Sequence, residues 1–135
     1  MSRRRGRELA MQMLFQEEMG GGSPAEVEEL FWRCHRASQE VRQFATLLYR
    51  TANAEKASID ERLSRFARNW RLERLNPVDR NILRTAVAEF LAGVSPRAVI
   101  VDEAVEIARA YGSDERSAEF VNGVLDAVLA ELEAK

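Results

Sequence analysis

The chain has 135 residues, of which 46% are hydrophobic and 31% charged, and its formal net charge is -2. This length and composition predict one soluble globular domain spanning residues 1–135, with a substantial core. No apolar run approaches the roughly 20 residues that a membrane span needs. The single cysteine, Cys34, cannot form an internal disulfide, and no signal-peptide cleavage site follows the charged start of the chain, so we expect a cytoplasmic protein.

The first predicted helix begins with a cluster of positive charge. Four arginines lie within the first seven residues, and an amphipathic helix is predicted from about Arg5 to Met19, ending in the three glycines at 20–22. Because arginine binds phosphate at two points and stacks on bases, a nucleic-acid backbone is the anion best matched to this segment. Composition alone leaves two alternatives open, a solvated tail and a membrane surface.

Capping signals mark the next three predicted helices. Residues 23–26, Ser-Pro-Ala-Glu, form a capping box with proline at the first helical position. A third helix is predicted to begin near Ser38. A second capping box at residues 58–61 predicts the start of a fourth helix, whose apolar stripe runs from Ile59 to Trp70.

Three further helices complete the predicted fold. Residues 76–79, Asn-Pro-Val-Asp, open a fifth helix that is apolar around much of its girth and is therefore expected at the centre. The sixth helix is predicted from Ala98 to Tyr111 with Gly112 as its cap, and the last from about Asp114 to Glu133. With no convincing strand pair, the sequence predicts an all-α fold, a compact bundle of about seven helices.

The sequence offers no catalytic or metal-binding constellation. His35 is the only histidine and lies next to Cys34, and side chains of adjacent helical residues do not converge. No other cysteine or histidine remains to complete a metal site. We therefore predict a binding protein without a cofactor or metal rather than an enzyme.

Four segments resemble those of a known family in their order and spacing over nearly the whole chain. They are the arginine-rich start with the helix up to Phe15, and residues 76–84, 98–108 and 120–126. The family is NusB, bacterial transcription antitermination factors. The resemblance implies two small helical bundles that bind boxA, a single-stranded RNA element of ribosomal RNA operon leaders, together with NusE. It also implies assembly with the RNA polymerase elongation complex, NusA and NusG, and leaves a homodimer open.

The resemblance also implies residue roles on the first helix. Phosphate contact is expected for the arginine-rich motif, which comprises Arg3, Arg4, Arg5 and Arg7. Gln12 and Phe15 lie three residues apart and share a helix face. Glutamine can read a base edge and phenylalanine can stack on a base. Core packing is an equal alternative for Phe15.

Further roles are implied on the last helix. Phe120 is expected to border the RNA, with a core aromatic as the alternative. The family's RNA-sensitive acidic position falls on Glu115 or is replaced by Arg116, and we include Arg116 among the RNA-binding candidates. Gly123 lies mid-helix, where glycine costs up to about 1 kcal/mol, so we expect close packing there, with Asn122 as a buried polar anchor.

One protein-partner residue is implied as well. Asp79 matches a family carboxylate that faces NusE, although a carboxylate at this helical position also serves the cap and the helix dipole. The alternative function is a non-enzymatic helical interaction or scaffold module whose arginine-rich N-terminus binds an acidic partner or a membrane surface.

Overall fold

The computed structural model describes residues 3–67, 75–112 and 115–134, which form helices and no strand. The all-α prediction is therefore confirmed for the described chain. The helices are α1 (Arg3–Gly20), α2 (Pro24–Cys34), α3 (Gln39–Ala54), α4 (Lys56–Phe66), α5 (Pro77–Ala92), α6 (Arg97–Tyr111) and α7 (Glu115–Glu133). Two residues named in the helix predictions, Trp70 and Asp114, lie outside the described residues.

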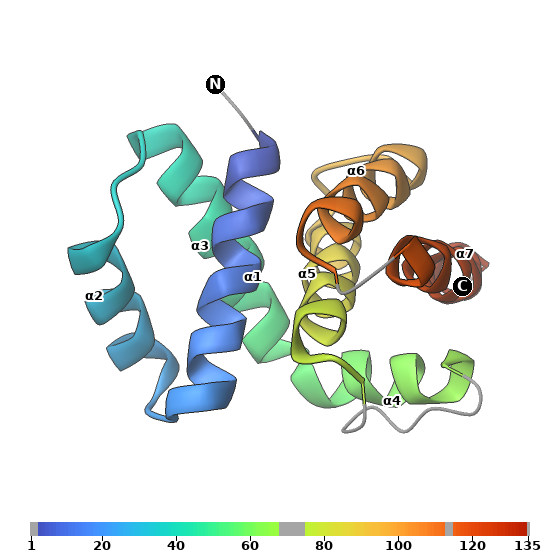
Figure 1. The fold of residues 1–135 in the computed structure, drawn as a ribbon, viewed down its shortest axis with the longest axis horizontal. Helices are drawn as coiled ribbons and strands as arrows, with labels where there is room; N and C mark the ends of the chain where they lie inside the picture. Colours follow the sequence, from blue (N-terminus) through green and yellow to red (C-terminus); the bar gives the residue numbers. More distant parts are fainter. Residues whose placement is uncertain (1–2, 68–74, 113–114, 135) are drawn as a thin grey trace.

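The helices form two groups, the two bundles, that meet at α5. Figure 1 shows α1, α2 and α3 on one side, and α4 to α7 on the other. α5 packs on α1 and α3 as well as on α4, α6 and α7, and Leu83, Val87 and Ala88 on it are fully buried. The buried apolar residues of both groups join in one core, so the predicted central position of α5 is confirmed.

Local capping chemistry fixes the starts of α2, α3 and α5. The Ser23 side chain accepts a hydrogen bond from the Glu26 amide, and Glu26 bonds back to the Ser23 amide, as the capping box predicts. Ser38 caps α3 and Asn76 caps α5 in the expected way. At the end of α5, Gly93 adopts φ 72°, a left-handed conformation that glycine accepts without strain.

The predicted capping box at residues 58–61 is wrong. α4 already begins at Lys56, and Glu55 precedes it at φ -108°, ψ 18° without a side-chain cap. Ser58 therefore lies inside α4, because helix-favouring residues let the helix resume one turn earlier. The carboxylate of Asp60 is thus left to bind Arg84 of α5, at 2.8 and 2.9 Å.

Gly112 caps α6 after Tyr111 as predicted, and it does so at φ -72°, so no left-handed turn requires glycine there. A Cβ there would lie 2.5 Å from the Ala108 carbonyl and 2.6 Å from Ser117 Cβ, so a close approach of α6 and α7 excludes a side chain. Gly123 was expected to be closely packed, yet no heavy atom of the described residues lies within 4 Å of its added Cβ. Asn122 is exposed rather than buried.

Candidate nucleic-acid interface

The first turn of α1 lies where the two bundles meet. Arg3 places its guanidinium 4.5 Å from the ring centre of Phe44 on α3. Its Nη1 also donates to the Val94 carbonyl at 3.0 Å and to Ser95 Oγ at 3.1 Å in the α5–α6 turn. Gly6 permits this approach, since a Cβ there would lie 2.7 Å from Phe44. The arginines therefore belong to an ordered helix that starts at Arg3 rather than Arg5.

The side chain of Arg7 is buried and forms an ion pair inside the protein. Its Nε and Nη2 each donate to the Glu89 carboxylate at 2.7 Å, and its Nη1 donates to Glu103 at 3.3 Å. The side chains of Arg7 and Glu89 are only 6% and 1% exposed. Because the three guanidinium nitrogens are already engaged in the interior, the prediction that Arg7 contacts phosphate is not supported and needs correction.

Arg4 and Arg5 remain open to solvent although each faces a carboxylate. Arg4 binds Glu103 through Nε and Nη2, both at 2.9 Å, and its side chain is 48% exposed. Arg5 binds Glu8 at 3.2 Å and is 45% exposed. The hydrogen bonds from Arg4 lower the pKa of Glu103, against an opposing effect of partial burial. Two parallel N–H donors on one carboxylate form the same fork that binds a phosphate.

Two carboxylates that organise this cluster were missed by sequence reasoning. Neither Glu103 nor Glu89 was assigned a role from the sequence. The sequence did contain one signal, since Glu89 is the one charged residue in the apolar stretch 86–92 of α5, and a buried glutamate is rare without a cation. It did not show which cation, because Arg7 and Glu89 are 82 residues apart.

Gln12 and Phe15 extend the cluster along α1. Phe15 is 38% exposed, so core packing does not explain it, and Gln12 is half-buried. They share a face with Arg5 and Glu8, since helical residues three or four apart are neighbours. The face offers cations at one end and an aromatic ring farther along.

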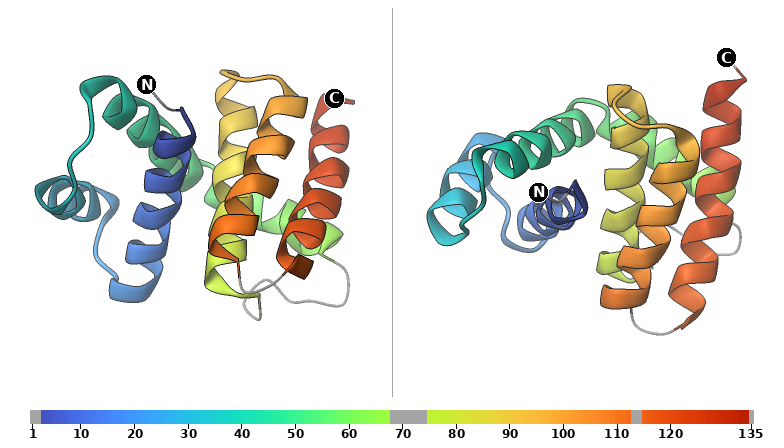
Figure 2. Two further views of the ribbon diagram at one scale, coloured as in Figure 1. Left: turned by 45° about the horizontal axis from the view of Figure 1, so that its top comes forward. Right: turned by 90° about the horizontal axis from the view of Figure 1, so that it is seen from above.

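Arg116 and Phe120 lie elsewhere. They are one helical turn apart in the first half of α7, with Arg116 exposed and Phe120 half-buried against the core. Figure 2 shows that α7 begins at the end of its bundle opposite the α5–α6 turn, which Arg3 contacts. The structure thus places the predicted RNA-binding residues on two surfaces rather than one.

Asp79 at the start of α5 is only 8% exposed. Its Oδ2 accepts a hydrogen bond from Ser117 Oγ of α7 at 3.0 Å, while Asn76 provides the side-chain cap of α5. Asp79 therefore ties the start of α5 to the start of α7, a contact that the local sequence does not reveal.

The described part of the chain offers little for other classes of site. It contains no group of three or more His, Cys, Asp or Glu side chains placed to hold a metal ion. None of the described helices is both long and apolar enough to cross a bilayer.

Comparison with known proteins identifies the family. Residues 4–130 match the NusB family. The chain belongs to the NusB family. Similar relatives are the transcription antitermination proteins NusB of Koribacter versatilis, 46% identical over 99% of this chain and 92% of that protein, and of Sorangium cellulosum, 46% identical over 97% and 94%.

Solved NusB structures share the fold described above. NusB of T. maritima aligns with a TM-score of 0.85 at 35% identity, covering 97% of this chain and 92% of that one. A chain from a crystal structure of antitermination factors NusB and NusE in complex with dsRNA aligns with a TM-score of 0.82 at 29% identity, covering 96% of both. The two-bundle arrangement is therefore the fold of the NusB family.

Proposed function

We propose that this chain is a non-enzymatic, cytoplasmic transcription antitermination factor that binds boxA RNA together with NusE and promotes processive elongation. Three facts support the proposal: the family match over residues 4–130, the relatives named as antitermination proteins, and a similar chain solved with NusE and RNA. The observation that carries it is the exposure of Arg3, Arg4 and Arg5 in one helical turn.

RNA binding would proceed by exchange of anions at this turn. A phosphate that approaches Arg4 takes the two-donor position held by Glu103, and a second replaces Glu8 at Arg5. The positive end of the α1 dipole adds to the attraction. Arg7 stays in the interior, where it holds Glu89 and one oxygen of Glu103.

Base contacts would follow along α1. Phe15 provides an exposed ring on which an unpaired base can stack, and Gln12 can donate to and accept from a base edge. Arg116 and Phe120 would contact a separate stretch of RNA, because they lie on the other bundle.

NusE would dock near the start of α5, around Asp79, and would add its own RNA contacts. We propose that the resulting complex joins RNA polymerase with NusA and NusG. A homodimer that hides the RNA surface is the competing assembly. Asp79 already accepts a hydrogen bond from Ser117. It would therefore support NusE binding in two ways, by its charge and by fixing the first turns of α5 and α7 relative to each other.

The proposal is tested by titrating labelled boxA RNA with the wild type and with Arg4→Ala/Arg5→Ala, with and without NusE, at two salt concentrations. The variant should bind about tenfold more weakly, and its slope of log affinity against log salt should be shallower by about 1.4, since each phosphate contact to single-stranded RNA contributes about 0.7. Its melting temperature should be unchanged, because both side chains are about half exposed.

The matched control is Arg33→Ala/Arg109→Ala, which removes two exposed arginines that also pair with a nearby glutamate. Equal RNA affinity of the Arg4/Arg5 variant and this control would overturn the proposal. Competition by anionic vesicles as strong as by boxA RNA would favour the membrane-surface alternative instead.

A further inference from the structure

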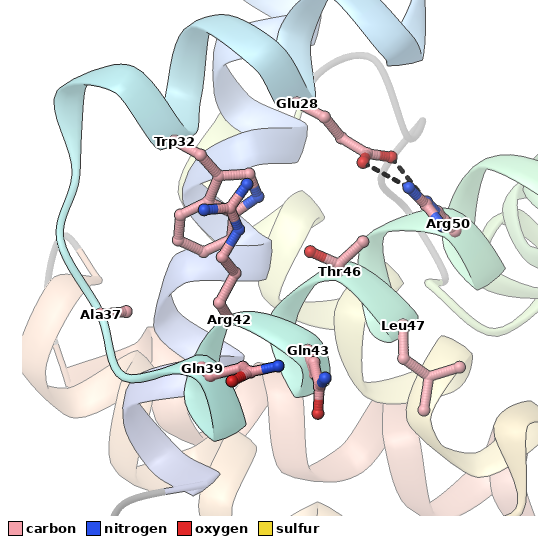
Figure 3. Close-up of a pocket in the computed structure, with 9 residues that line it drawn as sticks. All are labelled: Glu28, Trp32, Ala37, Gln39, Arg42, Gln43, Thr46, Leu47 and Arg50. Atoms are coloured by element: carbon pink, nitrogen blue, oxygen red, sulfur yellow. Dashed lines mark hydrogen bonds and ion pairs between the residues drawn. The ribbon is translucent and has the colours of Figure 1, made fainter.

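A polar groove lies between α2 and α3 (Figure 3). Its volume is about 720 Å³. Residues of both helices and of the loop between them line it: Glu28, Trp32, Ala37, Gln39, Arg42, Gln43, Thr46, Leu47 and Arg50. The residues discussed above for RNA and NusE binding are not among them.

The groove has positive charge that no carboxylate of the described residues neutralises. Its one acid, Glu28, is bound by Arg50 through two hydrogen bonds of 2.9 Å. Arg42 forms no ion pair with a carboxylate of the described residues, and neither does Arg36, which is exposed in the adjoining loop. The groove therefore presents cations to an anionic ligand and offers no unpaired carboxylate that would repel it.

An aromatic platform lies beside this charge. The guanidinium of Arg42 lies 5.2 Å from the ring centre of Trp32, and Figure 3 shows the two stacked between the helices. The indole Nε1 of Trp32 is buried and has no hydrogen-bond partner among the described residues. A buried donor without an acceptor destabilises the folded chain. The groove thus contains donors for which the described chain provides no acceptor.

The cationic end of α1 packs on another face of α3. Arg3 stacks on Phe44, which lies two residues after Arg42 and therefore on a different face of that helix. Like Arg36 and Arg42, Arg3 forms no ion pair with a described carboxylate. Figure 1 shows the start of α1 beside the start of α3 and the α2–α3 connection. Arginines without carboxylate partners among the described residues therefore lie on two faces of α3, at the α1 terminus and at the groove.

We propose that the α2–α3 groove is a second RNA subsite, which holds the single strand where it continues beyond the boxA contacts of α1. The inference rests on the proposed RNA-binding function. Arg36 and Arg42 bind phosphates, a base stacks on the outer face of the Arg42 guanidinium, and Gln39 and Gln43 bond base edges. An acidic peptide would match the charge, but RNA also matches the planar stack of Arg42 on Trp32.

The test compares boxA RNA alone with boxA RNA carrying an oligouridine tail of about six nucleotides, at either the 5′ or the 3′ end. The wild type should bind one of the tailed RNAs about tenfold more tightly than boxA alone. Arg36→Gln/Arg42→Gln should abolish this gain and leave the affinity for untailed boxA unchanged. The control Arg33→Gln/Arg109→Gln carries the same change in net charge and should keep the gain.

Trp32 provides a second readout. The chain has two tryptophans, so in a Trp70→Phe background the emission comes from Trp32. Tailed RNA should change this emission, and boxA alone should not.

Each outcome bears on one claim. The subsite proposal is overturned if the oligouridine tail does not raise the affinity of the wild type, or if it still raises the affinity of Arg36→Gln/Arg42→Gln. Neither result affects the proposal that the chain binds boxA. Arg42-dependent binding of a polyglutamate peptide without a tail effect would make the groove a protein-docking site and also overturn it. Failure of the wild type to bind boxA at all, with or without NusE, would instead remove the proposed function.

Discussion

Arg4 and Arg7 lie three residues apart on the same helix, and both bind glutamates, yet their surroundings differ. The Arg7–Glu89 pair is 6% and 1% exposed, whereas the Arg4–Glu103 pair is 48% and 22% exposed. A buried pair holds the fold, because either charge left alone in the interior is costly. An exposed pair contributes little to stability, and its arginine can exchange one anion for another. One arginine-rich motif therefore contains a structural residue and exchangeable ones.

The largest expected effect is that of breaking the buried pair. Arg7→Ala leaves the Glu89 carboxylate in the interior without its two strongest donors, which should lower the free energy of unfolding by about 3–5 kcal/mol. Urea unfolding followed by circular dichroism measures this loss. Replacing both partners, as in Arg7→Met/Glu89→Leu, should recover most of it, because the double variant leaves no unpaired charge. If Arg7→Ala were as stable as the wild type but bound RNA more weakly, Arg7 would be an RNA-binding residue rather than a structural one.

At the exposed Arg4–Glu103 pair we expect a smaller effect, a gain in RNA affinity rather than a loss of stability. Glu103→Gln removes the carboxylate that competes with phosphate for Arg4, so boxA affinity should rise about threefold at low salt and less at high salt. Fluorescence anisotropy with labelled RNA measures the gain. Asp102→Asn removes a neighbouring exposed charge that pairs with no described arginine, and it is the matched control. An equal gain in both variants would show a general charge effect rather than competition at Arg4.

The smallest effect concerns pH. Because Arg4 holds the pKa of Glu103 below its ordinary value near 4.5, the ionised carboxylate stabilises the folded chain above that value. This stabilisation is lost as the pH falls towards the lowered pKa. The stability difference between the wild type and Glu103→Gln should therefore be largest at neutral pH and shrink below about pH 4.5. Urea unfolding across this range checks the sign, and a difference that grows on acidification would contradict it.

Local signals predicted the helices better than they predicted the interactions between them. The caps at Ser23 and Asn76 depend on neighbours two or three residues away, so the sequence contains all of the relevant chemistry. The start of α4 was misplaced because the capping pattern at residues 58–61 competes only weakly with helix-favouring residues. The all-α fold and its family were accessible from the sequence because they depend on local patterns.

The site was only partly predictable. Exposure of Phe15 and burial of Arg7 depend on the angle at which α1 packs on α5, which no local pattern states. Glu89 and Glu103 reach α1 from helices more than eighty residues away. Gly123 shows the reverse error, since an apparent packing position is open surface.

Arg3 connects two bodies that are otherwise held together mainly through α5. Its guanidinium contacts Phe44 in one bundle and the Val94 carbonyl in the other. The side chain therefore bridges the interface between the two bundles. A ligand that binds Arg3 and breaks these contacts weakens the connection between the bundles. By reciprocity, a state in which the bundles are less tightly connected binds that ligand more strongly. Occupancy of the α1 terminus and the relative motion of the two bundles are thus thermodynamically coupled through Arg3, in addition to the contacts of Arg4 and Arg7 with Glu103 on α6.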